Sequence, residues 1–256
     1  MKAGILLLAR MAASRLPGKL MKEVMGRPLI DYQIERLRTS RRAGRIVLCT
    51  TTAPDDDVLA GFADRIGLEV FRGHPEDVVD RMVAAASHFD LETVISIGGD
   101  DVFSDPQAAD RIVESLERTG ADFAYFPELP SGTSPYGVTR GALERLLRIK
   151  IGGSDGWERY FQEDNGFRTE AIAPPSEALR RPELRMTLDY PEDFLFFQAV
   201  LESLYPGNPR FSLGDIIALR DRDTQIAAWG QARAEEWTRR YNAFHVEVDA
   251  PAEQNR

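Results

Sequence analysis

The feature that most constrains the fold of this chain is a regular alternation of short apolar segments with amphipathic ones over its first half. The apolar segments are hydrophobic at nearly every position, which is typical of parallel strands covered by helices on both faces. The predicted strands are residues 3–9, 45–50, 68–71, 93–97 and 121–126, and the predicted helices are 28–39, 56–66, 75–89 and 106–118. This alternation predicts an α/β fold with a twisted, mainly parallel central sheet.

The alternation ends at residue 126. We expect a loop at 127–136, a short strand at 137–139, a helix at 140–148, an inserted hairpin or arm within 151–175, a strand at 185–188, and helices at 191–204, 213–219 and 223–241. No internal repeat or low-complexity linker divides the chain. We therefore expect one domain over residues 1–246, with an inserted arm or dimerisation segment at about 127–180 and a polar tail at 247–256.

Composition excludes several classes of protein. The chain has 256 residues, 43% of them hydrophobic, which is enough for a substantial core, but it has no apolar run of the roughly 18 residues needed to span a membrane. The single cysteine, Cys49, cannot form a disulfide framework or a thiolate metal site, and its apolar neighbours indicate a buried structural thiol. We expect a cytoplasmic protein without membrane insertion.

Charge is distributed unevenly along the chain. Residues 1–45 hold eleven Lys or Arg and three Asp or Glu, a net charge of +8, whereas the whole chain carries −9. A basic region on an otherwise acidic molecule fits a small anionic ligand better than nucleic acid, which the remainder would repel. Part of the basic region is expected only to solvate one helix and its exit, namely Arg36, Arg38, Arg41, Arg42 and Arg45.

The segment that follows the first predicted strand is rich in cations. Arg10, Arg15 and Lys19 could neutralise phosphate oxygens, and N–H groups around Gly18 could add further donors. A solvated basic loop is the simpler alternative. Position favours a ligand, because open parallel sheets bind ligands beyond the carboxyl ends of their strands.

Acidic residues follow two later predicted strands. Gly98-Gly99-Asp100-Asp101 comes after the fourth strand, and Asp189 comes after the strand at 185–188. The alternative for the first group is a glycine turn with a helix cap, but Ser104-Asp105-Pro106 already provides a helix start. Oxygen ligands of this kind suit Mg²⁺, and Mg²⁺ with a basic loop is what nucleotidyl transfer requires. The chain has neither a Walker motif nor a G-x-G-x-x-G motif after its first strand.

Five blocks in order resemble the sugar cytidylyltransferases, and especially their spore-coat polysaccharide (SpsF-like) branch, which is related to the CMP-Kdo and CMP-sialic acid synthetases. The blocks are Arg10-Met11-Ala12-Ala13-Ser14-Arg15-Leu16-Pro17-Gly18-Lys19 with Gly26-Arg27-Pro28; Thr50-Thr51-Thr52 with Asp55-Asp56-Asp57; Arg72-Gly73 with Glu76-Asp77 and Asp80-Arg81; Gly99-Asp100 with Asp105-Pro106; and Arg185-x-Thr187-Leu188-Asp189 with Pro191-Glu192-Asp193. Ala12-Ala13, Gly98 and Asp101-Val102 depart from the family pattern.

The resemblance implies a single-domain Rossmann-like fold of the GT-A type, and a homodimer that binds CTP and a small sugar acceptor. By this resemblance Arg15 and Lys19 are catalytic, and Asp100 and Asp189 ligate Mg²⁺. The implied nucleotide-binding residues are Leu8, Ala9, Arg10, Met11, Ser14, Arg15, Lys19, Thr51, Arg72 and Gly99, and the implied acceptor-binding residues are Asp77, Arg81, Asp101, Tyr136 and Arg185.

Several alternatives stay open from sequence. Arg72, Asp77, Asp80 and Arg81 could equally be an ordinary set of ion pairs at a helix start, and the aromatic run 156–161 favours packing over acceptor binding. The resemblance implies transfer of CMP to a sugar, with a sugar acid as the first expectation and a sugar 1-phosphate as the second. A GT-A glycosyltransferase and a noncatalytic nucleotide-binding homologue are the alternative functions.

Overall fold

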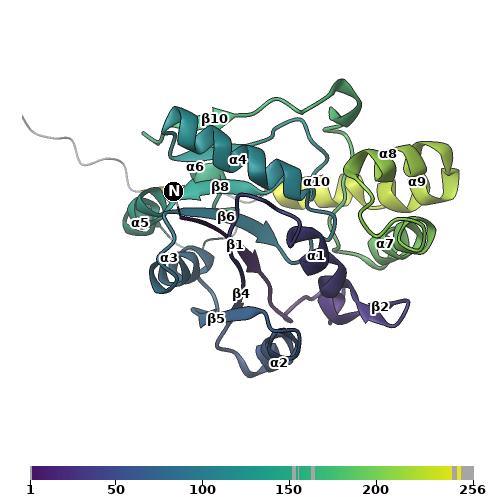
Figure 1. Ribbon diagram of the computed structural model, residues 1–256, viewed down its shortest axis with the longest axis horizontal. Coiled ribbons are helices and arrows are strands. Elements are labelled where there is room, and N and C mark those ends of the chain that lie inside the picture. Colours follow the sequence, from purple (N-terminus) through teal and green to yellow (C-terminus); the bar gives the residue numbers. More distant parts are fainter. Residues whose placement is uncertain (1, 152–153, 155, 163–164, 244–246, 249–256) are drawn as a thin grey trace, which may run out of the picture.

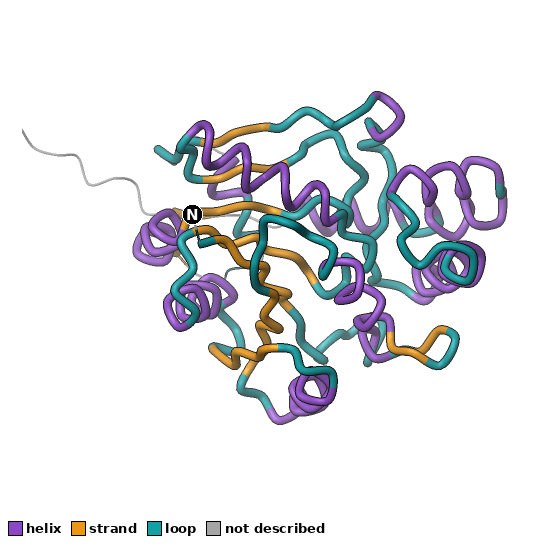
Figure 2. Tube along the Cα trace, viewed as in Figure 1, coloured by secondary structure: helices purple, strands orange, loops and turns teal. Residues whose placement is uncertain are grey.

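A seven-stranded sheet with helices on both faces forms the centre of the protein (Figures 1 and 2). The structure is a computed structural model that describes residues 2–151, 154, 156–162, 165–243 and 247–248. The strands of the sheet are β1 (Ala3–Leu8), β4 (Ile46–Thr51), β5 (Glu69–Gly73), β6 (Thr93–Gly98), β7 (Phe123–Tyr125), β8 (Tyr136–Thr139) and β10 (Thr169–Ala171). The α/β class and the mainly parallel sheet predicted from the sequence are confirmed.

The helices match most of the predicted amphipathic segments. They are α1 (Leu29–Leu37), α2 (Asp57–Arg65), α3 (Val78–His88), α4 (Pro106–Thr119), α5 (Arg140–Ile149), α6 (Arg159–Gln162), α7 (Pro191–Leu204), α8 (Leu213–Arg222), α9 (Thr224–Gln231) and α10 (Ala234–Asn242). Short 3-10 turns are η1 (Lys19–Met21), η2 (Pro54–Asp56) and η3 (Glu177–Leu179), and two small ladders pair β2 (Glu23–Val24) with β3 (Arg27–Pro28) and β9 (Lys150–Ile151) with β11 (Glu247–Val248).

The strand order β10-β7-β8-β6-β1-β4-β5 places a topological switch point at β1. The chain runs outward from β1 through β4 to β5, then returns to add β6 on the other side of β1, and all these pairs are parallel. At such a point the loops leaving two adjacent strands diverge and open a crevice at the sheet's carboxyl edge. Because β1 and β6 are adjacent and parallel, the basic loop after β1 and the acidic loop after β6 both begin at this edge.

Two hydrophobic clusters cover the two faces of the sheet. Alternate residues of β1 divide between them: Ile5 and Leu7 join the cluster under α1, α4 and α7, while Leu6 joins the cluster under α3 and α5. This division follows from the period of two along a strand, and it explains why β1 is apolar at every position. Within the part of the chain that the structure describes, none of the helices combines the length and the apolar character that crossing a membrane requires.

The region predicted as an inserted arm joins the central sheet over its described residues. β8 inserts antiparallel between β6 and β7, and β10 adds a parallel edge strand to β7. Phe161 stacks on Phe123 of β7 at 4.8 Å between ring centroids, and Trp157 meets the same ring edge-on at 6.1 Å. The aromatic run that the sequence assigned to packing is therefore packed against the sheet, which keeps this segment from forming a separate hairpin.

The predicted strand at 185–188 is wrong. Only Arg185 forms a β-bridge, an isolated one with Ser131, and the N–H of Leu188 donates to the carbonyl of Asp100 at 2.9 Å. The segment is extended, but its hydrogen-bond partners are loops instead of a strand. The predicted helix at 223–241 is also divided, into α9 and α10, by a break at Ala232 and Arg233. Residues 249–256 of the predicted tail lie outside the described residues.

Candidate active site

The loop between β1 and η1 is held in place by a buried carboxylate, Asp56. Its Oδ1 accepts a hydrogen bond from the N–H of Met11 at 2.6 Å, and its Oδ2 accepts from the N–H of Thr51 at 3.3 Å and from the Thr51 hydroxyl. Gly18 then adopts a left-handed conformation (φ 66°) and begins η1, which carries Lys19. Glycine adopts this conformation without the strain that a side chain would bring.

The acidic loop after β6 approaches the basic loop closely. The N–H of Gly99 donates to the carbonyl of Leu8 at 2.8 Å. A Cβ at Gly99 would lie 3.0 Å from Leu20 and 3.1 Å from the Cβ of Ala9, so a larger residue would push the two loops apart. Glycine at this position lets Asp100 follow directly beside the basic loop.

Two cations and two carboxylates converge where these loops meet. The Lys19 ammonium donates to Asp100 Oδ2 at 2.8 Å and to Asp189 Oδ1 at 3.1 Å, and the Arg15 guanidinium donates to the same Asp189 oxygen at 2.7 Å. The side chains of Lys19 and Asp189 are only 12% and 9% exposed. Four of the predicted site residues, which lie as far as 174 positions apart in sequence, are thus in direct contact.

Neighbouring charges set the protonation of this cluster. Burial opposes ionisation of Asp189, but Lys19 and Arg15 outweigh it and hold the pKa of Asp189 below its ordinary value. Burial likewise opposes the charge of Lys19, yet Asp100 and Asp189 raise the pKa of its ammonium. Both groups are therefore charged at neutral pH.

Asp101 differs from its neighbour Asp100. Burial raises the pKa of Asp101 well above its usual range, and the Asp100 and Asp189 carboxylates add to the rise. A Cβ at Gly98 would lie 2.6 Å from Asp100 Oδ1 and 2.9 Å from Asp101 Oδ2, so the glycine at this position leaves room for both acidic side chains. The departures from the family pattern at Gly98 and Asp101 are thus structurally linked.

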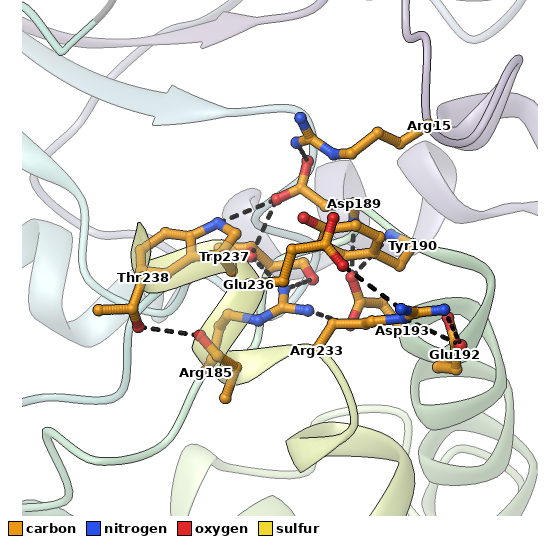
Figure 3. Close-up of polar contacts among 12 residues, drawn as sticks. Arg15, Arg185, Asp189, Tyr190, Glu192, Asp193, Arg233, Glu236, Trp237 and Thr238 are labelled. Carbon is orange, nitrogen blue, oxygen red and sulfur yellow. Dashed lines mark hydrogen bonds and ion pairs between the residues drawn. The ribbon is translucent and has the colours of Figure 1, made fainter. Parts of the chain in front are cut away.

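The extended segment that carries Asp189 is fixed by Asp193 (Figure 3). Asp193 Oδ2 accepts hydrogen bonds from the N–H groups of Asp189 and Tyr190, both at 2.8 Å, at the start of α7. Asp193 Oδ1 pairs with the buried Arg185, whose guanidinium also donates to the Thr187 hydroxyl at 2.7 Å. Arg185 therefore supports the segment from behind, and it does not line the cavity.

The cluster lines a cavity of about 490 Å³. Of the predicted site residues, those on its wall are Leu8, Ala9, Arg10, Ser14, Arg15, Lys19, Arg81, Gly99, Asp100 and Asp189. Arg10 is exposed, and its guanidinium makes no hydrogen bond or ion pair with the described residues. Trp157 and Glu158 also line the cavity.

The other predicted site residues lie away from this wall. Thr51 is bound to Asp56, as is the backbone of Met11, while Arg72 donates to the Thr51 and Ala53 carbonyls and pairs with Asp57. Asp77 caps the N-terminus of α3 and pairs with Lys150 at 2.5 Å. Asp101 and Tyr136 are also absent from the cavity wall, and Tyr136 stacks on Phe123 at 5.7 Å. For Arg72 and Asp77 the arrangement matches the alternative of ordinary helix-start contacts.

Sequence reasoning missed two residues that support the site. Asp56 was visible only as one of three successive aspartates, and nothing local distinguished the buried one. Trp237 donates its indole N–H to Asp189 Oδ2 at 3.1 Å from α10, 48 positions along the chain. A contact of this separation leaves no local signal, because helical periodicity reports only which residues share a face.

The carboxylates fit a divalent cation that also binds phosphate. Among the described residues, no group of three or more His, Cys, Asp or Glu could hold a metal alone. Asp100 and Asp189, however, place oxygens within about 3 Å of one shared cation, the Lys19 ammonium. Mg²⁺ is commonly held by one or two carboxylates together with substrate phosphates, so this donor set fits it.

A basic loop and paired carboxylates at the switch point of such a sheet are what nucleotidyl transfer requires. The chain belongs to the cytidylyltransferase family, because the family model described as "Cytidylyltransferase" matches residues 4–183. The recognition made from the sequence blocks is confirmed.

Two relatives and one solved structure agree with this assignment. The chain is 28% identical over 232 residues to the spore coat polysaccharide biosynthesis protein SpsF of Bacillus subtilis, which covers 88% of this chain and 96% of that protein. It is 30% identical over 117 residues to a 3-deoxy-manno-octulosonate cytidylyltransferase of Geobacter sulfurreducens, 44% of each chain. A cytidylyltransferase structure from Leptospira borgpetersenii superposes with a TM-score of 0.80 at 25% identity, covering 88% of this chain and 96% of that chain.

Proposed function

We propose that this protein transfers CMP from CTP to a sugar acceptor, releasing pyrophosphate, for the synthesis of a surface polysaccharide or glycan. The observation that carries the proposal is the convergence of Arg15, Lys19, Asp100 and Asp189 on one point of the cavity wall. The names of the relatives support the rest: one acts in spore coat polysaccharide synthesis, and another is a cytidylyltransferase for a sugar acid.

The residues of the basic loop bind and orient the triphosphate. Arg10 is free to contact a phosphate from the cavity rim, while Arg15 and Lys19 reach the same region from deeper positions. An acceptor hydroxyl attacks the α-phosphorus of CTP, the bond to pyrophosphate breaks, and the hydroxyl proton leaves to solvent. Arg15 and Lys19 stabilise the charge that develops on the phosphate oxygens, so no covalent intermediate with the protein is needed.

Asp100 and Asp189 would hold Mg²⁺ in this reaction. The bound ion would neutralise phosphate charge as pyrophosphate leaves. Because Thr187, Trp237 and the backbone of the 185–190 segment hold Asp189, this carboxylate is positioned before substrate binds.

The acceptor is proposed to occupy the part of the cavity beside Arg81, Trp157 and Glu158. A sugar acid is the proposed class, with its hydroxyl as the nucleophile and its carboxylate near Arg81. The support is the sugar acid in the name of the Geobacter relative, together with the guanidinium on this wall. The cytoplasmic location and the homodimer implied by the family resemblance are part of the same proposal.

Pyrophosphate release from CTP tests this function. With Mg²⁺ and a panel of sugar acids and sugar 1-phosphates, the wild-type protein should release pyrophosphate with at least one acceptor. Replacing Lys19 by Ala should lower turnover by about 100-fold or more, the usual cost of removing one donor to a developing phosphate or oxyanion charge. Lys22→Ala is the matched control, because Lys22 lies three positions away and outside the cavity wall.

The reaction product separates the proposal from its alternatives. Release of a nucleoside diphosphate from a nucleotide sugar would instead identify a glycosyltransferase. Nucleotide binding without turnover on any acceptor would favour a noncatalytic homologue. Near-normal turnover of Lys19→Ala would contradict the role given to Lys19.

A further inference from the structure

The last helix, α10, contributes polar side chains to the candidate site although it follows the sheet by many residues. Trp237 and Tyr241 are spaced four apart and share one face of the helix, and Arg233 is the residue immediately before the helix. Arg233 pairs with Glu192 at 2.9 Å, Trp237 donates to Asp189, and the Tyr241 hydroxyl donates to Glu158 at 3.0 Å. These contacts connect the start of α7, the carboxylate cluster and Glu158, which also lines the cavity.

Polar contacts, not a hydrophobic face, attach this helix. None of its residues from Ala234 to Asn242 is buried. The ring of Trp237 stacks on Tyr241 with 4.9 Å between centroids and an angle of 8°. The Arg185 guanidinium lies 5.9 Å from the centroid of the Trp237 ring. These contacts fix the plane of the indole and hence the direction of its N–H.

The two oxygens of Asp189 have separate partners. Oδ1 accepts from Arg15 and Lys19 and faces Asp100 across the Lys19 ammonium. Oδ2 accepts from the Trp237 N–H at 3.1 Å and from the Thr187 hydroxyl at 3.3 Å. An indole N–H is a donor only, so it cannot reverse its role when a ligand binds.

We propose that Trp237 is a positioning residue that holds Asp189 Oδ2 so that Oδ1 alone faces the phosphate and its divalent cation. This inference rests on the proposed function, and it makes α10 part of the site although the helix lies beyond the family match at 4–183. Groups that orient a metal-ligating carboxylate typically change metal affinity or activity by 10- to 100-fold when they are removed.

The test is Trp237→Phe, which keeps an aromatic ring to stack on Tyr241 and removes the N–H. Mn²⁺ binding is titrated by electron paramagnetic resonance in the presence of CTP, with the full-length protein and no acceptor. We expect the affinity for Mn²⁺ to fall by about tenfold or more. In a turnover assay at a divalent-cation concentration that saturates the variant, kcat should fall, while the KM for CTP should change less than about twofold because the basic loop is untouched.

Two further variants make the result specific. Trp229→Phe removes an indole N–H from α9, where the ring packs against the core, and should bind Mn²⁺ like the wild type. Thr187→Val removes the second donor to Asp189 Oδ2, and Thr187 does not belong to α10. This variant should also weaken Mn²⁺ binding. It therefore tests the positioning of Asp189 even if Trp237→Phe detaches α10 from the site.

The outcomes separate this inference from the proposed function. Wild-type Mn²⁺ affinity in Trp237→Phe would overturn the positioning role while leaving CMP transfer intact. A wild-type protein that binds Mn²⁺ with CTP, loses that affinity in Trp237→Phe and yet transfers no CMP would overturn the proposed function alone. Absence of any Mn²⁺ binding by the wild type would overturn the inference, because no metal site would exist to be positioned.

Discussion

Lys19 and Arg15 each make contacts that a ligand must exchange. In the ligand-free protein their positive charges are balanced by Asp100 and Asp189, which offsets the cost of burying them. When a triphosphate binds with its cation, anionic phosphate oxygens can replace the carboxylates as partners of Lys19 and Arg15. The cation can replace Lys19 and Arg15 as the partner of the carboxylates. Binding therefore exchanges one set of charge partners for another at the same side chains.

Cys49 illustrates a residue whose chemistry the sequence predicted correctly. It is fully buried in β4, and this burial raises the pKa of its thiol to about 12. We expect no reaction of the native protein with a thiol reagent at pH 8, because the thiolate is the reactive form. The measurement is labelling by a chromogenic disulfide, with the guanidinium-unfolded chain as the control that reacts with one equivalent.

The raised pKa of the Cys49 thiol also makes the stability of the protein depend on pH. The native thiol keeps its proton up to a higher pH than the unfolded thiol, whose pKa is about 8.5. The contribution of Cys49 to stability is therefore complete below about pH 8.5 and is lost as the pH rises toward the native pKa of about 12. Rapid labelling of the folded protein would contradict the burial of this residue.

At the scale of elements, the loop after β1 depends on Asp56 at the end of η2. This carboxylate accepts bonds from Met11 and Thr51, so it ties the basic loop to the end of β4. Replacing Asp56 by Asn should leave at least one of these donors unsatisfied and destabilise the protein by about 1–3 kcal/mol. The KM for CTP should rise more than kcat falls, because the loop that binds phosphate loses its anchor.

Urea unfolding and steady-state kinetics measure the two effects. Asp55→Asn is the matched control, since Asp55 is its exposed neighbour and makes none of these contacts. An Asp56→Asn protein with the stability and KM of the wild type would show that the loop holds its shape by other means.

The elements show which parts of the structure a sequence can predict. β1, β4 and β6 were predicted because their side chains are buried on both faces, and that leaves a continuous apolar run. The segment at 185–188 also contains buried apolar residues, Met186 and Leu188, but the backbone N–H groups of these residues donate to Ser131 and Asp100 in distant loops, which no local pattern reports. The break between α9 and α10 was missed for a related reason: Ala232 and Arg233 are ordinary helix formers.

The same reasoning applies to the candidate site. Arg10, Arg15, Lys19 and Asp100 were predicted because each follows a strand end, and strand ends meet at one edge of a parallel sheet. Asp189 was predicted by the same argument, although the segment before it is extended and is not a strand of the sheet. Trp237 and Asp193 were not given a role at the site, because their part is to hold other residues. Such contacts depend on tertiary packing and leave no recognisable pattern of residue spacing in the sequence.

At the scale of the whole molecule, the site joins parts of the chain that are far apart in sequence. The basic loop and Asp100 come from the first half, whereas Asp189 and α10 come from the last third. A ligand that contacts both parts must stabilise the native state as a unit, because it binds the folded chain and not the unfolded one. Bound CTP should therefore raise the unfolding temperature of the entire domain and not of one half.

The size of this effect can be estimated. A ligand at 100 times its dissociation constant adds about 2.7 kcal/mol to the free energy of unfolding, and a chain of this size gains about 2–4 °C in Tm per kcal/mol. Saturating CTP with Mg²⁺ should therefore raise Tm by about 5–10 °C in a single transition. Without the divalent ion the shift should be much smaller, because the triphosphate would face Asp100 and Asp189 without a cation between them.

Differential scanning fluorimetry with CTP in Mg²⁺, CTP in EDTA, and ATP, GTP and UTP in Mg²⁺ measures both the metal dependence and the choice of base. An equal shift in EDTA would contradict the metal role of the two carboxylates, and an equal shift with all four nucleotides would contradict a preference for CTP.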